Sequence, residues 1–173
     1  PKLVETMSVT KSFLALAVLF LIQDNKIKSI NNCISDYFSE WKNDERKNIT
    51  IKDVLTMTSQ LENSWDYDAF MFPDKDYTKV GELKKPNVDK IAQSLKYSTH
   101  KPDSHFEYNN LATQIIPSLV FKILNIHIND YLMERLFNPL NISIDWNCDD
   151  DKNPYGPNGL RISSNDLCKV GLL

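Results

Sequence analysis

The chain has 173 residues, of which 42% are hydrophobic and 25% are charged, as in an ordinary soluble globular protein with one domain. Its net charge of -3 lacks the basic excess of a nucleic-acid binder, so no nucleic-acid partner is expected. With only 4 glycines and neither a GxxxxGK nor a GxGxxG motif, nucleotide-binding loops of these types are excluded. The chain begins at Pro1 rather than at a methionine, which suggests a processed product or part of a longer protein.

The first strong element is an apolar helix that starts near Thr6 or Ser8 and ends at Asp24. Asn25 follows it, and Asn is one of the residues that takes the left-handed conformation common after a helix. Because the helix is apolar nearly all round, we expect it in the middle of a domain. Its apolar run, residues 13–22, is too short to span a bilayer. No membrane span or signal peptide is visible, and the sequence assigns no compartment.

The next helix is expected at Thr50–Ser59, where Thr50 and Asp53 form a start that resembles a capping box. The region that follows, residues 60–107, is irregular, aromatic and charged. Such a composition is typical of an ordered surface insertion rather than a disordered linker. We expect its aromatic part, Trp65–Tyr77, to line or cover a cleft.

The second half of the chain predicts further helices at Val88–Leu95, Asn110–Leu124, Ile128–Leu136 and Asp166–Leu173. Pro117 should kink or restart the second of these, because proline lacks the backbone N–H that a helix interior needs. The last helix should be capped by Ser164 or Asn165. Residues 145–159 predict a loop. Strand signals are weak and short, so the sequence indicates a mainly α chain.

The cysteines and histidines form no recognisable site. The three cysteines are odd in number and widely spaced, so no disulfide framework is expected. We expect buried free thiols instead, at Cys33, Cys148 and Cys168. The three histidines are scattered without metal-ligand spacing: His100, His105 and His127. We therefore expect no metal site and no cofactor.

Ser8 and Lys11 are the first candidate for chemistry. They stand three residues apart at the start of the apolar helix, so their side chains lie on one face. A lysine held beside a serine hydroxyl can take the serine proton and activate the oxygen as a nucleophile. The same S-x-x-K spacing occurs at Ser39–Lys42 and Ser98–Lys101. Only Ser8, however, heads a long apolar helix.

The second candidate is Tyr108-Asn109-Asn110, the only Y-x-N in the chain. A tyrosine opposite a serine–lysine pair can act as a second general acid or base. The alternative is a packed tyrosine followed by an asparagine that caps the next helix.

The two motifs and their surroundings resemble the serine β-lactamase-related family, which includes class C β-lactamases, DD-peptidases, esterases and 6-aminohexanoate-dimer hydrolases. Four segments match in family order: 7–27, 49–61, 101–123 and 158–173. Trp65-Asp66 is similar to the branch of the aminohexanoate-dimer enzymes. Gln60 and Asp103 each stand where the family usually has a glycine.

The resemblance implies that Ser8 is the nucleophile, Lys11 its base, Tyr108 an aid to proton transfer and Asn110 a substrate-binding residue. The reaction would form an ester on serine and then hydrolyse it. The substrate would be an ester, amide, β-lactam-type or peptide-like small molecule. One alternative is a non-catalytic helical binding module from the same family. Another is a plain helical bundle with chance motifs, which requires Ser8 and Tyr108 to lie far apart.

The family's third motif is Lys or His, a small residue and Gly on a strand, and it does not occur after residue 123. The resemblance therefore implies that residues 1–173 are the helical part of an α+β domain whose antiparallel sheet lies mostly outside the chain. We expect impaired hydrolysis by this chain alone. We also expect self-association through the surface of the Ser8 helix that would face the sheet.

Overall fold

The computed structural model describes residues 2–63, 87–98 and 105–173. The aromatic segment Trp65–Tyr77 and Asp103 lie outside these ranges, so their predictions are not tested. The helices, in chain order, are η1 (Met7–Val9), α1 (Thr10–Gln23), η2 (Ile34–Asp36), η3 (Ser39–Asn43), η4 (Glu45–Asn48), α2 (Ile51–Leu55), α4 (Val88–Ser94), α5 (Asn110–Thr113), α6 (Ile115–Leu124), α7 (Ile128–Leu132), the π-helix η6 (Met133–Phe137) and α8 (Ser164–Gly171).

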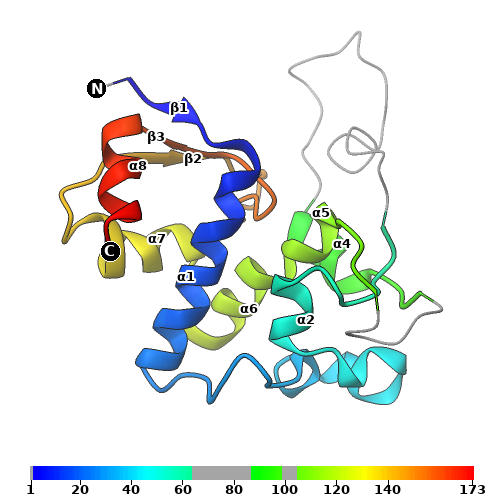
Figure 1. Ribbon diagram of the computed structural model, residues 1–173. Coiled ribbons are helices and arrows are strands. Elements are labelled where there is room, and N and C mark those ends of the chain that lie inside the picture. The colour runs from blue at the N-terminus through cyan, green and yellow to red at the C-terminus, as the bar shows by residue number, and fades with distance from the viewer. Residues whose placement is uncertain (1, 64–86, 99–104) are drawn as a thin grey trace, which may run out of the picture.

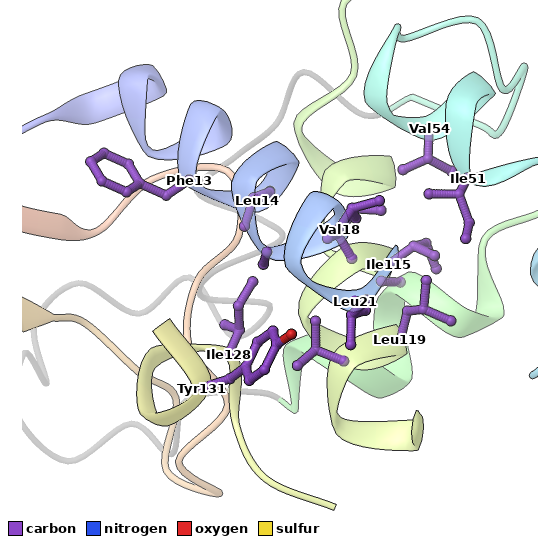
Figure 2. Close-up of a cluster of buried hydrophobic side chains, with 14 of the residues drawn as sticks. Phe13, Leu14, Val18, Leu21, Ile51, Val54, Ile115, Leu119, Ile128 and Tyr131 are labelled. Atoms are coloured by element: carbon purple, nitrogen blue, oxygen red, sulfur yellow. The ribbon is translucent and has the colours of Figure 1, made fainter. Parts of the chain in front are cut away.

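Helix α1 runs through the middle of the molecule, with the sheet and α8 on one side and α2, α4, α5 and α6 on the other (Figure 1). The predicted central helix is thus confirmed, and Asn25 takes the predicted left-handed conformation with φ 55°. Its buried side chains meet those of α2, α6 and α7 in one core (Figure 2). They are Phe13, Leu14, Ala17, Val18 and Leu21. Truncating one such leucine to alanine typically lowers the free energy of unfolding by about 3–5 kcal/mol. The helix that carries Lys11 is thus firmly anchored in the core.

Two of the other predicted helices are present in altered form, one shortened and one broken in two. The capping box of Thr50 and Asp53 is confirmed. Helix α2 nevertheless ends at Leu55 rather than at residue 59, because the chain turns through the left-handed Met57, φ 59°. The predicted helix at residues 110–124 is broken at Gln114, and α6 restarts there with Pro117 in its first turn. First-turn N–H groups have no partner within a helix, so proline is tolerated at that place.

A small antiparallel sheet was not predicted. It is made by β1 (Val4–Glu5), β2 (Ile144–Trp146) and β3 (Leu160–Ile162), in the order β1-β3-β2. The predicted loop at 145–159 is therefore wrong at its first two residues. Strands of two or three residues are too short to show the alternation by which a strand is recognised in sequence. The continuation of this sheet outside the chain stays a prediction.

Helix α8 begins at Ser164, and its cap is Ser163, whose Oγ accepts a hydrogen bond from the Asp166 amide. The predicted start at Asp166 and its caps were therefore placed one to two residues too late. Cys33 and Cys148 are half-buried and Cys168 is exposed, which corrects the expectation of buried thiols.

Val4, Val9 and Leu19 are exposed apolar side chains on β1, η1 and α1. The predicted self-association of the chain stays a prediction. Among the described residues, no single helix is long and apolar enough to cross a membrane. One helix pair bent by 78°, Asn110–Leu124 with Ile128–Phe137, meets that measure by length and composition.

Candidate active site

Ser8 is exposed and lies in η1, the single helical turn that precedes α1. The preceding residue, Met7, has φ 50°, a left-handed conformation that a residue with a side chain adopts at a cost of about 1–2 kcal/mol. The fully buried Thr10 supports the turn, because its Oγ1 donates to the Met7 carbonyl at 2.7 Å. Thr6 ties the same turn to β3 through the Leu160 carbonyl at 3.0 Å. The strain at Met7 thus presents the Ser8 hydroxyl at the surface.

Lys11 is the second residue of α1, three residues after Ser8, and its side chain points back at the serine. Its Nζ donates to Ser8 Oγ at 3.3 Å and to the Pro157 carbonyl at 2.8 Å. The amine is therefore held between the serine and the loop that joins β2 to β3. Sequence reasoning missed Pro157, because the contact is made by a backbone carbonyl that any residue could supply.

Tyr108 closes the third side of the site. Its hydroxyl donates to Ser8 Oγ at 2.8 Å, and Lys11 Nζ lies 5.1 Å from the centre of its ring. Burial raises the pKa of Tyr108, but hydrogen bonds with Ser8 and Lys11 and the charge of Lys11 outweigh burial. The pKa of the phenol therefore lies below its ordinary value, and the phenolate is more accessible than in a free tyrosine.

The backbone of Tyr108 is held by the segment that follows α2. The Glu107 amide donates to the Met57 carbonyl at 2.9 Å, and Asn63 Nδ2 donates to the Tyr108 carbonyl at 2.9 Å. Asn109 Nδ2 donates to the Leu61 carbonyl at 3.0 Å. The backbone is thus held on both sides of Tyr108, which fixes the position of its phenol.

Gln60, which stands where the family usually has a glycine, turns this segment. It has φ 58°, the left-handed conformation that glycine adopts without cost. Its Nε2 donates to the His105 carbonyl, close in sequence to Tyr108. The departure from the family pattern therefore preserves the turn and adds a tether to the segment that carries the tyrosine.

Asn110 is the first residue of α5 and is half-buried. The cap of α5 is Asn109, whose Oδ1 accepts from the Ala112 amide at 2.9 Å. The asparagine cap expected for this helix is therefore present, at Asn109 rather than Asn110, and the predicted role of Asn110 toward substrate remains untested.

Ser8, Lys11 and Tyr108 thus meet at one point, which contradicts the reading of chance motifs in a plain bundle. A hollow of about 890 Å³ is lined by Asp44, Lys52 and Tyr97 among others and includes none of these three residues. In the described part of the chain, no group of three or more His, Cys, Asp and Glu side chains could hold a metal ion.

One Lys-x-Gly sequence does follow residue 123, at Lys169-Val170-Gly171. It lies in α8 rather than on a strand, and Lys169 pairs with Asp166 at 2.6 Å. Its lysine is thus engaged within its own helix.

Comparisons with known proteins show which fold and family the chain shares. Protein flp of Staphylococcus aureus strain MW2 is 25% identical over 143 residues, which cover 79% of this chain and 26% of that protein. A 6-aminohexanoate-dimer hydrolase homologue from Bacillus anthracis has the same fold, with a TM-score of 0.81 at 20% identity over 98% of this chain and 47% of that one. A class C β-lactamase structure gives a TM-score of 0.69 at 18% identity, over 98% of this chain and 49% of that one.

The chain therefore spans about a quarter of that curated relative and about half of those solved structures. Its structural neighbours are hydrolases and penicillin-binding proteins of the serine β-lactamase type. The family model for β-lactamase matches residues 2–170, so the chain belongs to the β-lactamase family.

Proposed function

We propose that the protein is a serine hydrolase that works through an acyl-enzyme on Ser8. The observation that carries the proposal is the convergence of Tyr108 and Lys11 on one oxygen, at 2.8 Å and 3.3 Å from Ser8 Oγ. Both distances are within or near the range in which a base can take a proton from a nucleophile. The substrate class is an ester, amide, β-lactam-type or peptide-like small molecule, and this chemistry requires no cofactor.

In the acylation step, Ser8 Oγ forms a bond with the substrate carbonyl carbon while its proton passes to Lys11. The bond from that carbon to the leaving group then breaks, and Tyr108 or Lys11 returns a proton to the departing oxygen or nitrogen. The product is an ester on Ser8. The hydrogen bond to the Pro157 carbonyl keeps the Lys11 amine in place throughout the step, because an amine can donate whether or not it carries the extra proton.

In the deacylation step, a water molecule attacks the ester carbon and loses its proton to a base. Tyr108 suits this role, because the lowered pKa of its phenol makes the phenolate available. The bond to Ser8 Oγ breaks, and the serine regains its proton. Asn110, at the start of α5 two residues after Tyr108, would hold the substrate beside the serine.

The family resemblance implies a completed site with more hydrogen-bond donors than this chain supplies. The family resemblance places a second oxyanion donor on a strand after the third motif, and losing one such donor costs about 10²–10³-fold in rate. We therefore propose that residues 1–173 are part of a larger catalytic domain and hydrolyse substrates poorly alone. Ester turnover by these 173 residues that disappears in Ser8→Ala would contradict this impairment.

A fluorophosphonate probe on the full-length protein tests the assignment of the nucleophile. Labelling should be lost in Ser8→Ala. It should persist in Ser39→Ala, which removes the serine of another S-x-x-K sequence as a matched control. Absence of labelling in the folded wild-type protein would favour the non-catalytic binding module instead.

A further inference from the structure

A buried amide lies behind the active site, at the junction of α5 and α6. The side chain of Gln114 is fully buried. Its Oε1 accepts a hydrogen bond from the Gly156 amide at 2.7 Å, and its Nε2 donates to the Pro154 carbonyl at 2.9 Å. The same Nε2 donates to the Asp89 carboxylate at 2.8 Å. One side chain thus joins α4, the α5–α6 junction and the loop between β2 and β3.

Asp89 and the Pro154 carbonyl determine which way the amide faces. A carboxylate oxygen only accepts hydrogen bonds, so it selects the NH₂ end of Gln114 and leaves the carbonyl oxygen for the Gly156 amide. Ser118, one turn further along α6, also bonds to Asp89. The Gln114 amide therefore has one orientation in which all of its contacts are made.

The loop held by this amide reaches the catalytic lysine. Gly156 packs so closely that a Cβ there would lie 3.0 Å from the Thr113 carbonyl and 3.0 Å from Pro117 Cγ. The next residue, Pro157, presents its carbonyl to Lys11 Nζ at 2.8 Å. A single peptide unit therefore separates the Gln114 contact from the Lys11 contact.

Other contacts fix the remainder of the loop. Trp146 Nε1 donates to the Tyr155 carbonyl at 3.0 Å, and Asp149 accepts from the Asn153 amide at 2.9 Å. Among these anchors, only the Gln114 contact reaches the residue next to Pro157. Its loss would free that end of the loop while the rest stays in place.

We propose that Gln114 is a positioning residue that keeps Lys11 against Ser8 and Tyr108 by fixing Gly156 and, through it, the Pro157 carbonyl. The proposal deepens the proposed function and rests on it for its catalytic meaning. Gln114 touches none of the reacting groups itself. Without its amide, the buried Gly156 N–H, Pro154 carbonyl and Asp89 carboxylate would each lose a partner, and the segment would shift to find others.

The experiment uses Tyr108 as the reporter, because Lys11 contributes to the lowering of its pKa. Tyrosine labelled with ¹³C at Cζ is titrated by NMR in the purified chain, and Tyr108→Phe identifies the signal. Lys11→Met gives the full rise in pKa on losing the amine. Gln114→Met, similar in length and without polar atoms, should raise the Tyr108 pKa by about half of that rise or more.

Leu119→Ala is the control, because it removes a fully buried side chain from the same helix and destabilises the core without touching the loop contacts. It should leave the Tyr108 pKa at its wild-type value. An unchanged Tyr108 pKa in folded Gln114→Met, or an equal rise in Leu119→Ala, would overturn the proposal.

A second variant covers the case in which Gln114→Met does not fold. Gly156→Ala pushes the same loop away from α5 and α6 through its added Cβ, and it should raise the Tyr108 pKa in the same direction. An unchanged pKa in that variant would contradict the proposal. The titration needs no substrate. It therefore tests the role of Gln114 even if Ser8 is not labelled and the proposed function is wrong.

Discussion

The hydroxyl of Tyr108 donates a hydrogen bond of 2.8 Å to Ser8 Oγ, although the two residues are 100 positions apart in the chain. The contact joins the turn before α1 to the segment before α5. The start of α1 contributes Ser8 and Lys11, and the segment before α5 contributes Tyr108. The proposed chemistry therefore depends on the packing that brings α1, the segment after α2 and α5 together.

Tyr108→Phe removes the phenol and keeps the ring. We expect Ser8 labelling by a fluorophosphonate to slow by about 10²–10⁴-fold, the usual contribution of a positioned acid or base. In the wild type, the rate of deacylation of a pre-formed ester on Ser8 should rise with pH through a midpoint below 10.0, the ordinary pKa of tyrosine, because the Tyr108 phenolate is the proposed base of that step and the Tyr108 pKa is lowered. The pH series for both proteins checks this. A slowed variant that keeps the same pH profile as the wild type would contradict the role of the phenol.

Thr10→Val tests the support of the nucleophile turn. It replaces a fully buried hydroxyl that donates to the Met7 carbonyl at 2.7 Å by a methyl group of similar size. We expect a loss of about 1–2 kcal/mol in the free energy of unfolding, measured by urea denaturation. Thr10→Ser keeps the hydroxyl and should lose less than the valine variant. Equal stabilities of the serine and valine variants would show that this hydrogen bond does not support the turn.

Two substitutions at Gln60 separate its backbone strain from its hydrogen bond to the His105 carbonyl. Gln60→Ala keeps the left-handed backbone strain and loses the contact with the His105 carbonyl, whereas Gln60→Gly loses the contact but relieves the strain. The glycine variant should therefore be more stable than the alanine variant by about 1 kcal/mol. Thermal unfolding of the two proteins measures the difference. A less stable glycine variant would mean that residue 60 is not strained in the folded chain.

Asp89→Asn has a defined dependence on pH. Burial raises the pKa of Asp89, and although hydrogen bonds from Gln114 and Ser118 act in the opposite direction, the pKa stays above its ordinary value. A carboxyl whose pKa is higher in the folded state binds a proton more tightly there. The wild type should therefore lose stability relative to Asp89→Asn as the pH rises from about 4 through the folded pKa of Asp89.

Urea denaturation of wild type and Asp89→Asn across this pH range gives the difference directly. At neutral pH the free energy of unfolding of the asparagine variant should equal or exceed that of the wild type. Asn keeps an oxygen that accepts from Gln114 Nε2. A wild-type advantage that grows with pH would show that the folded state favours the charged carboxylate.

The sequence predicted the parts of the site that carry a residue signature. Ser8 and Lys11 follow from their spacing at the head of an apolar helix, and Tyr108 from a unique Y-x-N before another helix. It did not predict Pro157, because its contact uses a backbone carbonyl. Nor did it predict Gln114, since an amide in an apolar helix has no pattern that marks it as buried and fully bonded.

The fold shows the same division. The long helix α1 and the left-handed Asn25 were predicted because apolar content and helix-ending residues are local properties. Strands β1, β2 and β3 were missed, because two or three residues become a strand only through their partners. The end of α2 was misplaced for a related reason: the turn at Met57 is held by the Glu107 amide, a partner distant in the sequence.

The most direct test of the central claim is to map the covalent adduct of a fluorophosphonate on the full-length protein by mass spectrometry. The proposed function predicts one adduct, on the peptide that contains Ser8. The adduct should be absent in Ser8→Ala and strongly slowed in both Lys11→Met and Tyr108→Phe. An adduct on another serine, or labelling of Ser8 that is as fast without Lys11 and Tyr108 as with them, would contradict it.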